Sequence, residues 1–325
     1  MPLCAMLLLS VVMADAVPEV PAPLRLRKAL DDAAAAAAAK GSNLSATAEA
    51  LADAFSQRRL SLIVKTHASA YWNAQPFPHT VIDAILPESV AQALSAEMPE
   101  KTGKSHGCIA DADFCIHQRG REDRKSAWQD ERKMKPVTLM VFWALKSLEF
   151  TNFLRRLSGI ERALIADPEY NGAGAAFVGS GGRLNLHADF NKYRKFELDR
   201  RVNTFIYLNA DWPDAYGGHL ELWDRNLTSC VQRILPGWNR FVVFSTTDFS
   251  WHGHPQPLLC PRSRMRRSLA MYYYTRGRPD HECQSGDCKD AWHHGTIHTY
   301  PRVCKRCEEE ACRAFDAASV RVPRG

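Results

Sequence analysis

A series of short strand-like runs in the second half of the chain constrains the fold more than any other feature. After Asp167, runs rich in β-branched and aromatic residues alternate with turn residues, as at 179–182 and 236–237. The runs are 174–178, 183–190, 202–209, 219–223, 229–235, 240–245 and 268–275. Because no segment of helical length and spacing interrupts them, they predict an antiparallel barrel or jelly roll with flanking helices, a mainly β architecture.

Composition divides the remainder of the chain. Hydrophobic residues make up 46% and charged residues 24% of the sequence, which is typical of a globular protein. The formal charge is +6, but the sequence contains no motif that combines aromatic and basic residues. We therefore expect no nucleic-acid partner. No apolar run reaches the roughly 18 residues of a transmembrane segment. The expected divisions are a candidate signal peptide (1–16), an Ala/Pro-rich linker or spacer (17–59), a helical N-terminal support region (60–166), the β core (167–279) and a Cys/His-rich tail (280–325).

The first divisions carry weaker patterns. Residues 1–16 contain an apolar stretch from Leu3 to Val12 but have no Lys or Arg before it, so either the secretory pathway or the cytoplasm fits. The alanine run that follows could form a helix, but it has little apolar bulk and favours a spacer. Further on, we predict a strand at 77–83, a helix opening at Pro87 and a helix over 139–157. The charged stretch 118–135 favours a solvated loop and helix face, with a substrate-docking rim as the alternative.

One predicted strand carries a metal-binding pattern. Residues two apart on a strand point to the same face, so His187 and Asp189 project together, with Asn185 beside them. A third ligand must come from another strand, and His252 follows the apolar run 240–245. His254 is an alternative third ligand, because both histidines flank Gly253 and side-chain alternation does not distinguish them. Two imidazoles and one carboxylate suit non-haem iron, because they leave coordination positions open for a bidentate 2-oxo acid and O2.

The far carboxylate of such a co-substrate requires a buried cation. Alternation along 267–275 places Arg267 on one face with Leu269, Met271 and Tyr273, and an arginine on an apolar face suits a planar anion. Arg266 would then point outward, although a register slip of one residue would exchange the two arginines.

These motifs resemble the prolyl 4-hydroxylase-like branch of the iron(II)/2-oxoglutarate dioxygenases. The matching pieces are LNLHADF, RRVNTFIYLNADW, GGHLELWD, NRFVVFSTTDFSWHGHP and RRSLAMYYYT, all within 174–279. The resemblance implies a double-stranded β-helix of the jelly-roll, cupin-like type. It also implies metal ligation by His187, Asp189 and His252. It further implies a co-substrate site in which Arg267 binds the C5 carboxylate, with Tyr207 as a second group and Leu220 as an apolar wall.

The activity implied by the resemblance is hydroxylation of a C–H bond in a prolyl or other residue of a peptide or protein. Fe(II) is the expected metal, O2 and 2-oxoglutarate the co-substrates, succinate and CO2 the by-products, and L-ascorbate the reductant. Two alternatives stay open: a related oxygenase acting on a small molecule or free amino acid, and a non-catalytic metal-binding jelly roll. In the tail, disulfides, a zinc site and free thiols are all compatible with Cys283, Cys288, Cys304, Cys307 and Cys312.

Overall fold

The computed structural model describes residues 17–100, 109, 112–118, 122–282 and 296–299. The candidate signal peptide (1–16) and the tail cysteines lie outside the described residues, so the predictions made for them stay predictions. Among the described residues, no helix is both long and apolar enough to cross a membrane.

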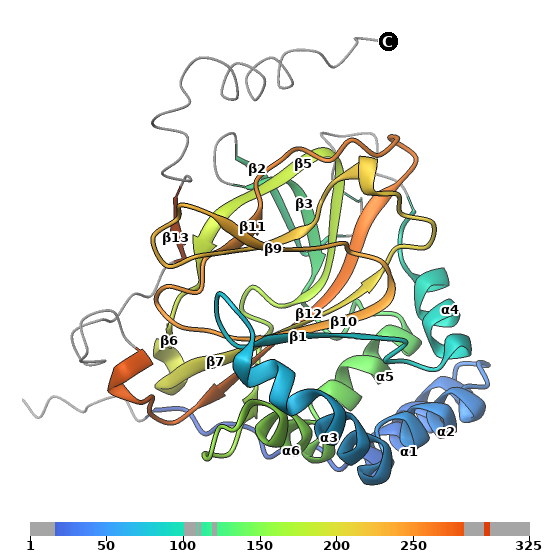
Figure 1. The fold of residues 1–325 in the computed structure, drawn as a ribbon. Coiled ribbons are helices and arrows are strands. Elements are labelled where there is room, and N and C mark those ends of the chain that lie inside the picture. The colour runs from blue at the N-terminus through green and yellow to red at the C-terminus, as the bar shows by residue number, and fades with distance from the viewer. Residues whose placement is uncertain (1–16, 101–108, 110–111, 119–121, 283–295, 300–325) are drawn as a thin grey trace, which may run out of the picture.

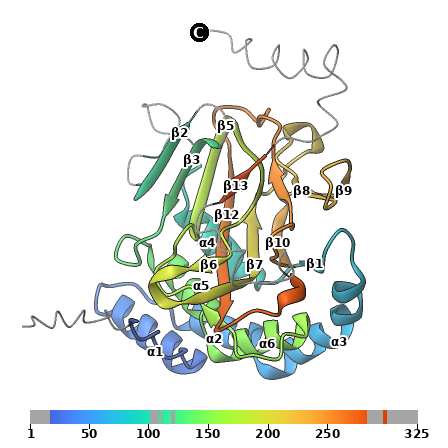
Figure 2. The same ribbon diagram turned by 90° about the vertical axis from the view of Figure 1, so that its left-hand side faces the viewer.

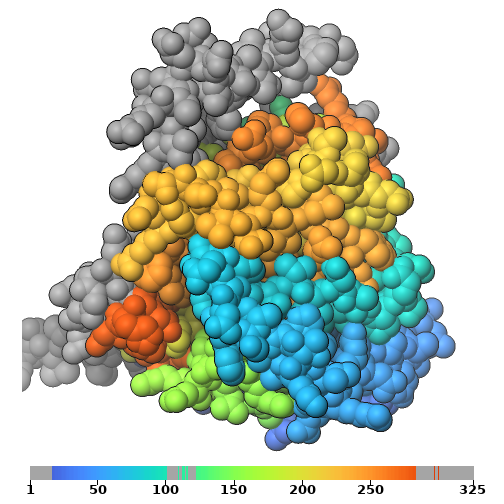
Figure 3. Space-filling view, in the orientation of Figure 1, coloured from blue at the N-terminus to red at the C-terminus, as the bar shows by residue number. Residues whose placement is uncertain are grey.

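The helices gather mainly on one side of the molecule, below the sheets in the view of Figure 1. They are α1 (Leu26–Ala38), α2 (Ser45–Ala54), α3 (Gln57–Asn73), α4 (Glu88–Glu97), α5 (Pro136–Leu145) and α6 (Leu148–Ser158). In the space-filling view, residues of the N-terminal half, coloured blue to green, cover the lower part of this face, and yellow and orange strand residues form the upper part (Figure 3).

The prediction of a spacer over 17–59 is wrong, because this segment contains α1 and α2. Leu26, Leu30 and Ala33 lie on one side of α1 at helical spacing and are buried, and Leu51 of α2 is fully buried. The alanines between them allow the helices to pack closely against α5, so few large side chains suffice.

The helix predicted over 139–157 is two helices. The first ends at Leu145, and Ser147 caps the second, since its hydroxyl accepts a hydrogen bond from the Phe150 amide at 3.2 Å. The helix predicted to open at Pro87 is confirmed as α4.

All the strands described belong to one curled, largely antiparallel sheet system. The strands are β1 (His79–Asp83), β2 (Phe114–Gln118), β3 (Glu122–Trp128), β4 (Ile165–Ala166), β5 (Gly174–Ala188), β6 (Lys192–Tyr193), β7 (Leu198–Leu208), β8 (Leu220–Trp223), β9 (Cys230–Ile234), β10 (Trp238–Ser245), β11 (His252–His254), β12 (Met265–Thr275) and β13 (Ile297–His298). Their main order is β1-β10-β7-β12-β5-β11-β8-β9. This order confirms the predicted jelly-roll, double-stranded β-helix architecture.

The long strand β5 joins the two halves of this system. Its first part pairs with β12 and its last part with β11, so β5 combines the two strands predicted at 174–178 and 183–190. Its other edge carries β3 and then β13 (Figure 2). The stretch 118–135, predicted as a solvated loop and helix face, therefore contains a strand of the sheet. The tail likewise contributes β13 rather than being only an appendage.

Strand β12 is buried on both faces, and this decides which of its side chains reach the interior of the barrel. Leu269, Met271 and Tyr273 belong to the main hydrophobic cluster, together with helix residues such as Phe150 of α6. Tyr273 donates a hydrogen bond to the Leu145 carbonyl of α5 at 3.0 Å. The more apolar face of β12 therefore packs against the helices, and the other face lines the barrel.

Candidate metal centre and adjoining cavity

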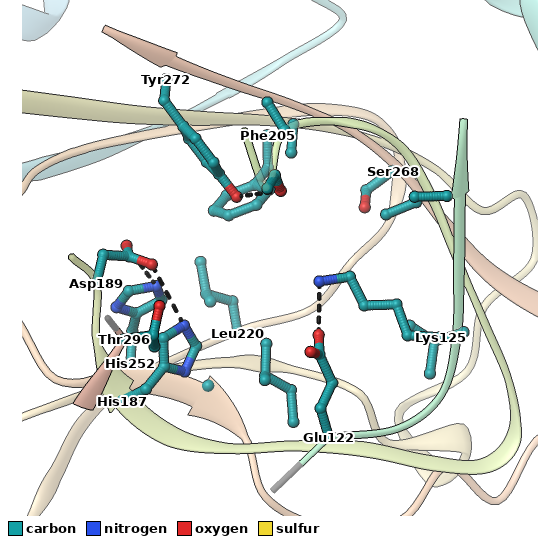
Figure 4. Close-up of a pocket in the computed structure, with 18 of the residues that line it drawn as sticks. Glu122, Lys125, His187, Asp189, Phe205, Leu220, His252, Ser268, Tyr272 and Thr296 are labelled. Carbon is teal, nitrogen blue, oxygen red and sulfur yellow. Dashed lines mark hydrogen bonds and ion pairs between the residues drawn. The ribbon is translucent and has the colours of Figure 1, made fainter. Parts of the chain in front are cut away.

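A cavity of about 320 Å³ lies inside the barrel, between the half of the sheet built on β12 and the half built on β11. Figure 4 shows His187, Asp189 and His252 on one side of it, Lys125 and Glu122 on the other, and Leu220 between them. Residues from β3, β5, β7, β8, β11 and β12 line the cavity, and so does Thr296, next to β13. We call the end with the two histidines the metal end and the end with Arg266 and Lys125 the inner end.

The two histidines and the aspartate form one buried group. A ligating atom from each of His187, Asp189 and His252 lies within 4.8 Å of those of the other two. The Nε2 atoms of His187 and His252 lie 3.7 and 3.4 Å from carboxylate oxygens of Asp189. Because His187 of β5 pairs directly with His252 of β11, strand pairing itself brings the distant ligand to the motif.

Backbone contacts fix the orientation of both imidazoles. His187 Nδ1 lies 2.8 Å from the carbonyl oxygen of Asn185, and His252 Nδ1 lies 2.9 Å from that of Ser250. A nitrogen facing a carbonyl carries the proton, so in the neutral imidazole Nε2, which lies toward Asp189, is the nitrogen free to bind a metal. Asn185 thus contributes through its backbone oxygen. Of its neighbourhood on β5, Leu184 lines the cavity.

Gly253 allows β11 to approach β5 closely. A Cβ atom at this position would lie 2.7 Å from the carbonyl oxygen of Asn185 and 2.9 Å from that of Leu184. Both atoms are backbone, so a larger residue would force the strands apart. The pairing also shifts register between His252 and His254, which is why the neighbours of the two histidines on β5 are three residues apart.

Asp189 has two further partners. The Asn203 side chain donates to its Oδ2 at 2.7 Å, and the Arg200 guanidinium lies 3.1 Å from the same oxygen. Burial raises the pKa of the Asp189 carboxyl, but Arg200 and the two imidazoles lower it more, so the net pKa falls far below the ordinary range. Asp189 is therefore a carboxylate at neutral pH. Arg200 carries no signal in the sequence that separates it from Arg201.

The two candidate histidines of β11 have different surroundings. His252 belongs to the three-residue group and His254 does not. Burial lowers the pKa of His252 despite the opposing effect of Asp189, so the imidazole is neutral and able to bind a metal. His254 is buried and lines the cavity, its pKa is lowered well below the ordinary value by burial, and its Nδ1 has no hydrogen-bond partner within the described part of the chain.

The predicted inward direction of Arg267 is wrong. Its guanidinium donates to the carbonyls of Ser95 and Leu208, outside the cavity, whereas Arg266 lines the cavity. Arg266 Nε donates to the Gly218 carbonyl at 2.8 Å, and one of its terminal nitrogens donates to the Tyr207 hydroxyl at 3.1 Å. The reason is that the helices pack against the face of β12 that carries Leu269, Met271 and Tyr273. Alternation had assigned this face, with Arg267, to the interior of the barrel.

The other predicted co-substrate residues lie in the cavity. Tyr207 and Leu220 both line it, on β7 and β8. Burial raises the pKa of the Tyr207 hydroxyl against the lowering effect of Arg266, so the phenol keeps its proton and can donate a hydrogen bond. Arg266 makes no ion pair with any carboxylate among the residues that the structure describes, which leaves its charge available to an anion.

Sequence reasoning missed Glu122 and Lys125, which enter the cavity from β3. The Lys125 ammonium donates to Glu122 at 2.5 Å, and both side chains line the cavity. Their segment was read as solvent-exposed because charged residues dominate it, and no signal in the sequence pointed inward.

The donor set suits a ferrous ion and a 2-oxo acid. Two imidazoles and one carboxylate on one side of a buried cavity leave space for a bidentate ligand. Arg266 and Tyr207 could hold the distal carboxylate of that ligand at the inner end.

Comparison with known proteins gives a consistent result. Residues 173–274 match the model of the 2OG-Fe(II) oxygenase superfamily. The chain is 28% identical over 139 residues to the mouse (Mus musculus) prolyl 3-hydroxylase OGFOD1, which covers 40% of this chain and 23% of that protein. The match thus spans about a quarter of the length of that curated relative.

Two solved structures are also similar. A prolyl hydroxylase from Trichoplax adhaerens, in complex with a hypoxia inducible factor peptide, has 17% identity and a TM-score of 0.46, covering 67% of this chain and 91% of that one. A prolyl-4-hydroxylase from Pseudomonas putida has 16% identity and a TM-score of 0.43, covering 67% of this chain and 100% of that one.

Proposed function

We propose that the protein is an iron(II)- and 2-oxoglutarate-dependent dioxygenase that hydroxylates a C–H bond, since residues 173–274 match the model of the 2OG-Fe(II) oxygenase superfamily. One observation carries the proposal: the group His187, Asp189 and His252 shares a cavity with Arg266, a cation without a carboxylate partner in the described residues. Binding of a metal ion alone would not require this cation, whereas the distal carboxylate of a dianionic 2-oxo acid would pair with it.

Each group of the chain has a defined part in this activity. His187, Asp189 and His252 bind the iron, which when bound supplies the activation of O2. Arg266 and Tyr207 bind and orient the distal carboxylate of 2-oxoglutarate. Arg200 and Asn203 keep Asp189 ionised and fixed.

The apolar wall of the cavity has a part of its own. Leu220, Phe205 and Ala270 line the space between the two ends and limit the access of water to the co-substrate.

For the substrate, we propose a residue of a peptide or protein, with proline as the first candidate. Similarity to a prolyl 3-hydroxylase supports this choice, and the position of the hydroxylated carbon is left open. L-Ascorbate is proposed as the reductant that sustains turnover.

The co-substrate part is tested by anaerobic titration of Fe(II) and then 2-oxoglutarate into the full chain. A metal-to-ligand absorption band should appear in the wild type and should be absent in His187→Ala. His281→Ala, an exposed histidine outside the metal group, serves as the matched control and should keep the band. Succinate release in air should follow the same order. Normal succinate release from His187→Ala would contradict the proposal.

The substrate part needs a separate experiment. Proline-containing peptides are incubated with enzyme, iron, 2-oxoglutarate and ascorbate, and mass spectrometry detects the gain of one oxygen atom. Oxidation of free amino acids or small metabolites without any peptide product would replace the peptide substrate by the small-molecule alternative.

A further inference from the structure

Lys125 and Arg266 reach the cavity from opposite edges of the same strand. Val178 of β5 pairs with Lys125 of β3 on one edge and with Arg266 of β12 on the other. Residues paired directly across antiparallel strands point to the same face, so the three side chains form a row inside the barrel, which we call the Val178 row. All three line the cavity.

A backbone irregularity turns both members of the Lys125–Glu122 pair inward. Residues three apart on a regular strand face opposite sides, but β3 shifts register between Asp123 and Lys125. Arg124, between them, has a φ of 53° and donates to the Ser180 carbonyl at 2.6 Å, which fixes the bulge. Glu122 therefore pairs with Leu184 and Lys125 with Val178, and both face the cavity.

The inner end has more positive than negative charge. Glu122 is the carboxylate that pairs with Lys125 in the described residues, and Arg266 has none. At the metal end, by contrast, the Asp189 carboxylate is matched by Arg200. Burial lowers the pKa of the Lys125 ammonium, but Glu122 outweighs this effect and the net pKa is raised, so Lys125 is charged at neutral pH.

The ammonium of Lys125 has donors to spare. An ammonium has three N–H donors, and Glu122 accepts one of them. The Lys125 side chain is 21% exposed and that of Glu122 is 15% exposed, so both are largely buried, and both line the cavity. Figure 4 shows the ammonium directed into the cavity, opposite the metal group. A ligand that offers oxygen acceptors at this end would satisfy these donors.

We propose that Lys125 is a second cation for the distal carboxylate of the 2-oxo acid, held in place by Glu122, so that β3 is part of the co-substrate site. The inference rests on the proposed function, because it adds a residue to the co-substrate site proposed there. Arg266 binds the carboxylate from β12 and Lys125 binds it from β3. The pairing favours the co-substrate over the oxidised substrate as the ligand of Lys125, because Lys125 and Arg266 flank the same residue, Val178.

The test is calorimetric titration of two 2-oxo acids into the Mn(II)-loaded full chain under nitrogen. The first is 2-oxoglutarate, and the second is 2-oxopentanoate, which has the same chain length but no distal carboxylate. Lys125→Met should weaken 2-oxoglutarate binding about 10- to 100-fold, the range expected for a hydrogen bond to a charged group. Binding of 2-oxopentanoate should change by less than about twofold, because its metal-binding half is unaffected.

A double variant tests whether Lys125 binds the carboxylate of 2-oxoglutarate directly or only neutralises the charge of Glu122. Lys125→Met alone leaves a carboxylate in the cavity that would repel any anion, whereas Lys125→Met/Glu122→Gln removes both charges. The double variant should still bind 2-oxoglutarate at least about tenfold more weakly than the wild type. Lys133→Met, a lysine outside the cavity that pairs with Asp113, is the matched control and should bind both acids normally.

Wild-type affinity in the double variant would overturn the inference, since Lys125 would then only offset Glu122. Equal weakening of both acids by Lys125→Met would also overturn it, because the effect would lie at the metal end or in the fold. A change confined to the KM of the oxidised substrate would assign Lys125 to that substrate instead. Failure of the wild type to bind 2-oxoglutarate would overturn the proposed function itself, and is distinguishable from these results.

Discussion

The two ends of the cavity differ in how completely their polar groups are satisfied by the protein. At the metal end, both imidazoles contact backbone carbonyls through Nδ1, and Asp189 contacts Asn203 and Arg200. At the inner end, Glu122 pairs with Lys125, and Arg266 pairs with no carboxylate among the residues described. The metal end is therefore preorganised by the chain alone, whereas the inner end is completed by an anion.

The largest effect should come from the two adjacent arginines of β12. Arg266→Met should weaken 2-oxoglutarate binding by about 100-fold or more, because a bidentate, charge-assisted contact is lost. Arg267→Met, the matched control, should change it by less than about threefold, since Arg267 contacts backbone carbonyls outside the cavity. Calorimetric titration measures both. A larger loss of affinity in Arg267→Met than in Arg266→Met would show that Arg267, as predicted from strand alternation, binds the co-substrate.

A change at the metal end should affect the metal before the co-substrate. In Gly253→Ala the new Cβ would meet two backbone oxygens of β5, so β11 must move and carry His252 away. We expect Mn(II) affinity, followed by electron paramagnetic resonance, to fall about 10- to 100-fold. Gly237→Ala is the control, because its Cβ would meet only the end of the Arg240 side chain at 3.8 Å. Unchanged metal affinity in Gly253→Ala would show that strand contact does not position His252.

Removal of a group that supports Asp189 should have a smaller effect. Asn203→Ala removes the amide that donates to Asp189 Oδ2, and Mn(II) affinity should fall about tenfold. Asn152→Ala, on the exposed side of α6, should leave the affinity unchanged. An equal fall in both variants would mean that loss of stability, rather than the orientation of Asp189, reduces metal binding.

The smallest effect lies outside the cavity and separates stability from ligand binding. Glu131 accepts from Lys146 at 2.9 Å and from the Tyr170 hydroxyl at 2.7 Å. Burial raises the pKa of Glu131, but these partners lower it more, to below its ordinary value of 4.5. Its stabilising contribution is therefore fully present above that ordinary value and is lost as pH falls through the lowered folded-state pKa.

Glu131→Gln should cost about 1 kcal/mol or less at neutral pH, because the pair is partly exposed to solvent. The cost should shrink on acidification, as followed by urea unfolding between pH 7 and 3. Affinities for Mn(II) and 2-oxoglutarate should not change. A cost that stays constant with pH would show that packing, rather than charge, is responsible.

The metal end could be predicted from the sequence because its pattern is local. His187 and Asp189 keep regular alternation, and the family resemblance identified His252. The jelly-roll order followed from the runs and turns of the second half. These inferences required only the periodicity of strands and the spacing of motifs.

The inner end could not be predicted in the same way, because it depends on long-range packing. The choice between Arg266 and Arg267 depends on which face of β12 the helices cover, and both faces proved to be buried. Glu122 faces inward beside Lys125 because of a bulge at Arg124, which no alternation rule contains. The helices α1 and α2 were missed for a related reason, since small alanine side chains become buried only when another helix lies against them.

The short length of β11 has a consequence for the exchange of the bound metal. This strand covers only His252–His254, whereas β12 extends over Met265–Thr275 and pairs along its length with β5 and β7. Local unfolding requires least free energy where few backbone hydrogen bonds must break. His252 should therefore detach from the sheet in brief openings while His187 and Asp189 stay in place. The rate at which bound metal exchanges with solution would then report the opening of β11, and not the global unfolding of the domain.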